Sequence, residues 1–168
     1  MRRTAPRPAG KICLLTAALG LTVPAPATAA PAPVPQARSV TLPVDGTFAG
    51  PREKVRLAGT LVVTVVTAPD AAGGGTARIV SGLDDAEGTG EPSGGTYGLA
   101  GTQRDSLPFS AAATTTLTVR PALVLTSPAV PPAPAVQPDR VRPVMVSVTV
   151  TADGVIGAVT AVVGPPAS

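Results

Sequence analysis

Two β-rich runs that meet at an Asp-Gly pair constrain the fold more than any other feature of this chain. Residues 144–163 read VMVSVTVTADGVIGAVTAVV, with apolar and hydroxyl-bearing side chains alternating before and after the pair. Asp-Gly is typical of a two-residue hairpin turn, because both turn positions require φ > 0. Such a turn sets Ala152 opposite Val155 and makes one face of the hairpin apolar. We therefore predict a hairpin over residues 144–163, with the pairs Val150/Gly157, Val148/Val159, Val146/Ala161, Val144/Val163, Ser147/Thr160 and Thr149/Ala158.

The earlier part of the chain also has the patterns of strands rather than helices. Residues 114–120 alternate Thr with Leu and Val, and residues 55–67 are β-branched through their second half. The paired valines of this second segment suggest a strand that is covered on both faces. Residues 39–44, 77–81 and 96–102 are weaker strand candidates. Because an isolated hairpin is only marginally stable, we expect the C-terminal hairpin to dock on these strands.

Six to eight strands separated by turn residues predict one all-β domain over residues 39–168. The expected architecture is an antiparallel β-sandwich, Ig-like or similar, and an open β-barrel is the alternative. The Pro-rich stretch 127–143 is interpreted as a long loop within this domain, ahead of the hairpin. Residues 30–38, APAPVPQAR, are interpreted as an extended Pro-rich tether.

Residues 1–29 have the three-part plan of a secretory signal peptide. Four basic residues precede an apolar run over residues 12–23, and small residues follow at 27–29. The apolar run is too short to cross a membrane, which takes about 20 residues. We therefore predict cleavage near Ala29-Ala30 and a secreted, extracellular chain with no transmembrane segment. The abundance of Ala, Gly, Pro and Val suggests a GC-rich bacterial source.

Removal of this leader changes the charge of the chain. The sequence holds 13 Lys and Arg and 10 Asp and Glu, and four of the basic residues lie in the leader. Nine basic residues then face ten acidic ones, a net charge of −1, so a nucleic-acid partner is not expected. The chain has no His, and its one cysteine, Cys13, lies in the leader. His-based triads, thiol nucleophiles and typical zinc sites are therefore excluded beyond residue 29.

The stretch SGLDDAEGTGEP, residues 81–92, is the densest cluster of ionisable side chains. It is most simply a solvated acidic loop between strands. Calcium is the alternative, because it takes oxygen ligands on flexible loops, although the spacing differs from the EF-hand pattern. A carboxylate-based hydrolase is a further alternative, and it needs two acids in different environments. The candidate metal ligands are Asp84, Asp85, Glu87 and Glu91.

These exclusions leave recognition, rather than catalysis, as the expected activity. A Ser-Lys dyad would depend on Lys54, the only lysine after the leader, and its place just ahead of a strand favours a solvated side chain. We expect a secreted, non-enzymatic interaction or structural module with no cofactor and a protein or cell-envelope partner. Sheet edges and Thr-rich faces are the surfaces that could make such contacts. The oligomeric state stays open, as do calcium and the hydrolase.

Overall fold

Residues 34–126 and 138–164 are described by the structure, a computed structural model. They belong to the second of two compact units of the chain, residues 32–168. The elements of these residues are all strands, and no helix among them could cross a membrane. The strands are β1 (Gln36–Ala49), β2 (Lys54–Pro69), β3 (Gly75–Glu91), β4 (Thr96–Ala100), β5 (Thr102–Phe109), β6 (Thr115–Val119), β7 (Leu123–Thr126), β8 (Asp139–Val141), β9 (Val144–Val150) and β10 (Ile156–Val163).

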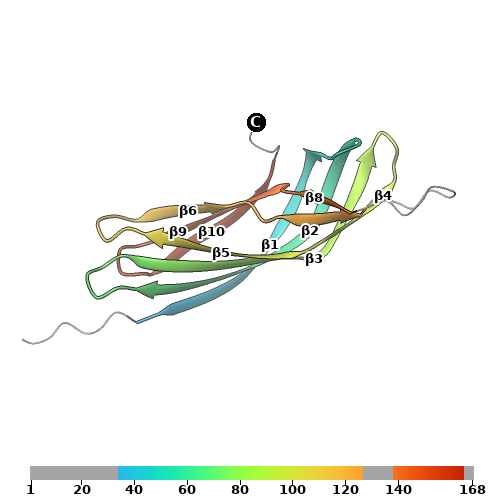
Figure 1. The fold of residues 1–168 in the computed structure, drawn as a ribbon. Coiled ribbons are helices and arrows are strands. Elements are labelled where there is room, and N and C mark those ends of the chain that lie inside the picture. The colour runs from blue at the N-terminus through green and yellow to red at the C-terminus, as the bar shows by residue number, and fades with distance from the viewer. Residues whose placement is uncertain (1–33, 127–137, 165–168) are drawn as a thin grey trace, which may run out of the picture. The chain divides into compact units, whose positions relative to one another are not determined.

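The strands form two antiparallel sheets that enclose one core (Figure 1). The larger sheet has the order β1-β2-β3-β4-β7-β8, with β5 paired to β3 as a seventh strand. The smaller sheet has the order β10-β9-β6, and the two sheets do not close into a barrel. The prediction of an all-β antiparallel sandwich is therefore confirmed.

The long strand β3 joins two halves of the larger sheet. One edge of β3 pairs with β2 along almost its whole length. Its other edge pairs with β5 over residues 75–82 and with β4 over residues 87–89. Between β4 and β5, Gly101 takes a φ of 143°, a conformation that glycine adopts most readily. β4 and β5 therefore run as one bent strand beside β3, and Figure 1 shows β1, β2 and β3 bending together.

The core is built from alternate residues of each strand, the period expected when one face of a strand is buried. Burying a Val or Leu side chain contributes about 1.5–3 kcal/mol, so these stripes supply much of the driving force for packing the sheets together. The largest fully buried side chains are Val144, Val146, Val148 and Val150 of β9, and Val55, Leu57, Leu61, Val63, Val65, Ile79, Leu123 and Leu125 of the larger sheet.

The C-terminal hairpin has the predicted register over most of its length. β9 and β10 bring together four of the six predicted pairs: Val148/Val159, Ser147/Thr160, Val146/Ala161 and Val144/Val163. Each apolar pair has its β9 member fully buried, as the alternation of the sequence indicates.

The turn of this hairpin differs from the prediction. The amide of Thr151 donates to the Val155 carbonyl oxygen, and the amide of Gly154 donates to that of Thr151, both at 3.0 Å. The loop therefore has three residues, with Gly154 at a φ of 80°. As a result Val150 faces Ile156 instead of Gly157. A bulge that spans the predicted Gly157 and Ala158 pairings takes up the extra residue and restores the predicted register.

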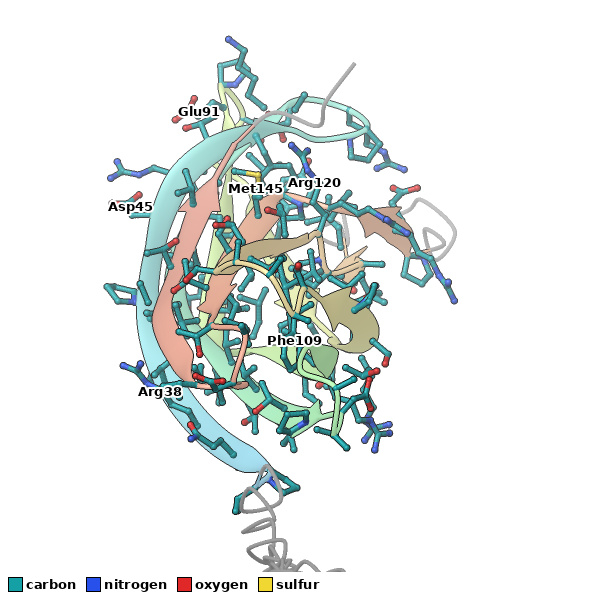
Figure 2. The ribbon with its side chains drawn as sticks, turned by 90° about the vertical axis from the view of Figure 1, so that its left-hand side faces the viewer. Arg38, Asp45, Glu91, Phe109, Arg120 and Met145 are labelled. Atoms are coloured by element: carbon teal, nitrogen blue, oxygen red, sulfur yellow. The ribbon has the colours of Figure 1, made fainter. Side chains whose placement is uncertain are left out.

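Hydrogen bonds dock the hairpin on the larger sheet, as expected. The Thr67 hydroxyl of β2 donates to the Gly154 carbonyl oxygen at 2.7 Å. The amide of Gly74 donates to the Ala152 carbonyl oxygen at 3.0 Å. The Arg38 guanidinium of β1, labelled in Figure 2, donates to the carbonyl oxygen of Gly157. Together these bonds hold β10 beside β1.

Several boundaries differ from those predicted. β1 begins at Gln36 rather than Ser39, so the end of the predicted tether is strand. The predicted leader, residues 1–29, lies outside the described residues. So do residues 127–137 of the predicted Pro-rich loop, whereas Asp139–Val141 forms β8 and pairs with β7.

The prediction that β2 is covered on both faces is wrong for this chain. Its inner residues Leu61, Val63 and Val65 are fully buried, but Val66 on the outer face is 38% exposed. Pairs of adjacent valines report the β-branched preference of a strand, and this preference holds on a face that meets solvent as well as on one that meets the core.

Candidate functional site

The acidic stretch of residues 84–91 lies on β3, so the prediction of an acidic loop is wrong. The glycines that suggested a loop are strand residues with no room for a side chain. A Cβ on Gly88 would come within 2.7 Å of Leu99 Cδ1 and within 2.9 Å of Val55 Cγ1. Gly90 is also buried and lies beneath the side chain of Glu53. Close packing, rather than turn formation, explains these two glycines.

The four predicted calcium ligands all lie on β3. Glu87 and Glu91 are exposed and lie four residues apart on β3, about 13 Å between their Cα atoms at about 3.3 Å per residue. Among the side chains that the structure describes, no group of three or more His, Cys, Asp or Glu could hold a metal ion. The side chains of Asp84 and Asp85 lie outside that description. A calcium ion at Asp84, Asp85, Glu87 and Glu91 therefore stays a prediction.

Glu53 organises one end of the sandwich, a role that the sequence did not reveal. Its carboxylate accepts hydrogen bonds from the Ser93 hydroxyl at 2.6 Å, the Tyr97 hydroxyl at 2.7 Å and the Ser93 amide at 3.1 Å. The bonds from Ser93 and then Tyr97 lower the pKa of Glu53. The bond to this carboxylate raises the pKa of Tyr97. The cluster ties the β1–β2 turn to the β3–β4 turn.

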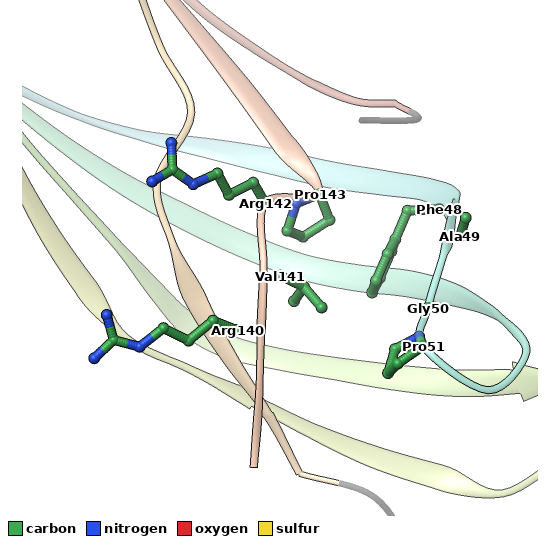
Figure 3. A pocket seen from close by; sticks show the side chains of 8 residues that line it. All are labelled: Phe48, Ala49, Gly50, Pro51, Arg140, Val141, Arg142 and Pro143. Atoms are coloured by element: carbon green, nitrogen blue, oxygen red, sulfur yellow. The ribbon is translucent and has the colours of Figure 1, made fainter. Parts of the chain in front are cut away.

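A hollow of about 400 Å³ opens between the β1–β2 turn and β8 (Figure 3). The amide of Gly50 donates to the Glu53 carbonyl oxygen at 3.0 Å and closes the turn that carries Pro51. Phe48, at the end of β1, is 3% exposed and fixes the aromatic part of the lining. The hollow is lined by Phe48, Ala49, Gly50, Pro51, Arg140, Val141, Arg142 and Pro143.

β8 presents apolar and cationic side chains in opposite directions. Val141 points toward Phe48, whereas Arg140 and Arg142 point the other way, as successive residues of a strand do (Figure 3). Both arginines are exposed, and neither forms an ion pair or a hydrogen bond with the described residues. Within the described part of the chain, β8 pairs only with β7, along one edge. An apolar hollow, two guanidinium groups and an open strand edge therefore meet at one place.

Two further hollows adjoin this one and are also lined by apolar and cationic side chains. Arg140 also lines a hollow of about 340 Å³ with Arg104 and Val124, and Val124 is 37% exposed. Arg142 also lines a hollow of about 270 Å³ with Val162, which is 56% exposed. Exposed apolar and cationic groups therefore alternate around β8, a composition suited to a partner with both apolar and acidic groups.

Polar side chains on the inner face of β3 and β5 form a second set that the sequence did not indicate. Ser81 is fully buried, and its hydroxyl has no hydrogen-bond partner among the described residues. Gln103 donates to Asp105 Oδ1 at 3.0 Å and accepts from the Ala122 amide at 2.6 Å. The other carboxylate oxygen of Asp105 is buried without a partner in the described part. A charge that points inward from an edge strand opposes pairing with a further strand, so Asp105 protects the edge of β5.

Comparison with known proteins identifies no relative: no protein-family model, no curated protein and no solved structure matches this chain. The function must therefore be argued from the residues themselves.

Sequence reasoning missed the hollow because its β8 wall falls in the Pro-rich stretch interpreted as a loop. Residues 139–143 read DRVRP, and the alternation Arg140-Val141-Arg142 is the signal that could have indicated a strand. Three residues are too few for such a pattern to stand out between prolines. Phe48 and Pro51 reach the same place only through the bend of β1 and β2, which no local pattern encodes.

Proposed function

We propose that this chain is a secreted, non-enzymatic β-sandwich that binds a polypeptide partner through the hollow beside β8. The observation that carries the proposal is the arrangement of β8, with Val141 in the hollow and Arg140 and Arg142 on its other side. The leader-like residues 1–29 support export, and the net charge of −1 beyond them makes this cationic surface a local feature.

The alternation along β8 specifies the chemistry of the partner. A segment that pairs with the open edge of β8 places its alternate side chains on the same two faces as those of β8. Side chains on the face of Val141 enter the apolar hollow, and those on the face of Arg140 and Arg142 meet guanidinium groups. An extended segment that alternates apolar and acidic residues therefore fits best, with the arginines favouring carboxylates through charge-assisted hydrogen bonds.

The lining of the hollow supports binding rather than catalysis. The eight residues that line it contribute apolar side chains, backbone and parts of two arginines whose guanidinium groups point away, but no carboxylate, hydroxyl or thiol. Acid–base or nucleophilic chemistry requires such groups within hydrogen-bond reach of a substrate. Arginine, which stays protonated, serves instead to hold an anionic group.

Fluorescence anisotropy with a labelled ten-residue peptide of alternating Glu and Val tests the proposal. The exported protein should bind this peptide, and binding should weaken as salt is raised. The double variant Arg140→Glu/Arg142→Glu should lose binding at least tenfold. Arg78→Glu, which changes an exposed arginine of β3 outside the hollow, is the matched control and should bind as the parent does. Equal binding of an alternating Lys/Val peptide, or unchanged binding by the double variant, would refute the proposal.

The acidic residues of β3 provide the test against the alternatives. Replacing Asp84, Asp85, Glu87 and Glu91 together by Ala should leave peptide binding unchanged. Neither Glu87 nor Glu91, whose side chains the structure describes, is among the residues that line the hollow. Loss of binding in this variant would move the site to β3.

A thermal melt with calcium and with chelator tests the calcium alternative. N-terminal sequencing of secreted protein tests export, and an intact Met1 would contradict export.

A further inference from the structure

We infer that the outer edge of β6 pairs with β6 of a second copy of this chain, in antiparallel register about a two-fold axis. This surface is distinct from the hollow at β8 and does not depend on it. The inference rests on which sheet edges are protected, on the direction of the backbone groups of β6, and on the self-complementarity of its sequence.

The edge of β8 belongs to the hollow described above, and three of the other four edge strands in the described part carry a feature that discourages pairing with another chain. β1 contains Pro43 and lies beside β10, where the Arg38 guanidinium covers carbonyl oxygens of β10. β5 contains Pro108 and the inward carboxylate of Asp105. β10 is bulged. Prolines, bulges and inward charges are usual means of protecting an edge.

β6 has none of these features. Its sequence TTLTV holds no charged residue, no proline and no bulge in its pairing with β9. On its other edge it has no strand partner among the described residues. An unprotected, uncharged edge of this kind is a template for another strand.

Hydrogen bonds of β9 fix the direction of the backbone groups on β6. The Pro143 carbonyl accepts from the Gly164 amide and the Thr151 amide donates to the Val155 carbonyl, so odd-numbered residues of this segment face β10. Alternate residues of an antiparallel strand direct both backbone groups to the same side. Even-numbered residues of β9, such as Val148, therefore face β6.

The register of β6 on β9 completes the assignment. Leu117 lies opposite Val148 and Val119 opposite Val146, so these odd-numbered residues bond to β9. The amide and carbonyl groups of Thr116 and Thr118 then point away from the smaller sheet. β6 thus offers two amides and two carbonyl groups at its outer edge.

A two-fold axis at Leu117 satisfies all four of these groups. Thr116 of one copy lies opposite Thr118 of the second copy, and each pair exchanges two backbone hydrogen bonds. The Thr side chains form cross-strand pairs on the outer face, and the two Leu117 side chains lie on the core side. Residues 115–119 carry no charge, so the two copies of β6 do not repel each other at this contact. An isologous contact needs this kind of self-complementary patch.

The strand count of the two sheets agrees with an added strand at this edge. In the half that faces the smaller sheet, the larger sheet has four strands, β1, β2, β3 and β5, against three in the smaller sheet. β10 lies beside β1, so the place of a fourth strand in the smaller sheet lies next to β6 and opposite β5. The inner side chain of Leu107 on β5 is only partly buried, and a strand in that place would cover it.

Disulfide trapping tests the register in a Cys13→Ser background, which leaves the chain without other cysteines. The Cα atoms of a hydrogen-bonded antiparallel pair lie about 5.5 Å apart, within disulfide range, whereas like positions lie about 7–8 Å apart on the diagonal. Thr116→Cys and Thr118→Cys should therefore cross-link when mixed and oxidised, but not when oxidised separately. Equal cross-linking of the separate variants would overturn this register.

Solution mass tests the dimer itself. The parent protein should show twice the chain mass by light scattering at high concentration and dissociate on dilution. Thr118→Lys places a charge at the edge and should give a monomer with an unchanged circular dichroism spectrum. Thr160→Lys is the matched control, an exposed threonine on β10 away from this edge, and should stay dimeric. A monomeric parent at every concentration, with no cross-link in the mixture, would overturn the inference.

Discussion

The hydroxyl of Thr67 donates a hydrogen bond to the carbonyl oxygen of Gly154, 2.7 Å away and 87 residues later in the chain. Both sheets meet at this bond, because Thr67 lies on β2 and Gly154 in the turn between β9 and β10. Ser81 on β3 is equally buried, yet its hydroxyl has no hydrogen-bond partner in the described part of the chain. Two buried hydroxyls of one sheet thus have opposite energetic roles.

Removing these two hydroxyls should change stability in opposite directions. Thr67→Val leaves the buried Gly154 carbonyl without its donor and should lower the free energy of unfolding by about 1–3 kcal/mol. Ser81→Ala removes a hydroxyl that is buried without a bond and should raise it by about 1 kcal/mol. Urea denaturation of both variants measures the difference. Equal destabilisation by the two substitutions would contradict these opposite roles of the two hydroxyls.

Gly154→Val should destabilise the fold by about 1–3 kcal/mol, because a β-branched residue resists a positive φ. Gly154 has a φ of 80°, and its Cβ would also lie 3.2 Å from Pro69 Cγ. Thermal melts should therefore show a lower midpoint. Gly98→Val is the control, since Gly98 is an exposed strand residue whose Cβ would meet only Thr126 at 3.7 Å. A similar loss in both variants would argue against a special role for the turn.

Asp105→Asn should raise the free energy of unfolding by about 1 kcal/mol at neutral pH. The substitution removes a charge from an oxygen that is buried without a partner, and it keeps an acceptor for Gln103 at 3.0 Å. Asp70→Asn, at an exposed residue after β2, removes the same charge without that burial and should have little effect. If chemical denaturation gives the same change for both, net charge rather than burial is the cause.

The Glu53–Tyr97 bond should make stability fall at both ends of the pH range. Because the folded protein lowers the pKa of Glu53 from its usual 4.5, the stability gained is present above that value and lost as acidification protonates Glu53. The folded protein raises the pKa of Tyr97 from its usual 10.0, so this gain is present below that value and lost as pH rises through the folded pKa. Urea midpoints measured against pH should show both losses.

Substitutions separate the two ends of this profile. Glu53→Gln should flatten the acid side, and Tyr97→Phe should flatten the alkaline side. Asp45 also has a lowered pKa, through its hydrogen bond and ion pair with Arg56, but the two side chains are 62% and 59% exposed. Because solvent screens exposed pairs, Asp45→Asn should alter the acid side less than Glu53→Gln. The reverse order would show that the Glu53 cluster is not the main acid-sensitive contact.

The hairpin shows how much of the fold the sequence could predict. Its alternation determined the faces of β9 and β10, because a one-residue slip would expose the buried valines. The length of its turn was not predictable from Asp-Gly alone. The bulge between Ile156 and Val159 depends on tertiary contacts, among them the bond from Arg38 to Gly157. Local pattern therefore predicted the register, and tertiary contacts set the turn.

The candidate site was far less predictable than the fold. Glycines at 88 and 90 suggested a loop because glycine is common in turns, whereas in the folded chain they give room to Leu99 on β4 and to Glu53 in the β1–β2 turn. The hollow combines Phe48 with Val141, which are separated by almost the whole domain. Such a combination follows from the bend of the larger sheet and has no signature in either segment.

The place of β10 beside β1 determines when this chain can fold. Until residues 144–163 have been synthesised, β6 has no partner strand in the smaller sheet and the inner face of the larger sheet has little to cover it. Contacts between segments this distant form slowly, because the intervening chain must lose entropy first. A nascent chain should therefore stay open until its last hairpin emerges. If the chain is exported as we propose, this late closure would keep it able to thread through a narrow translocation channel.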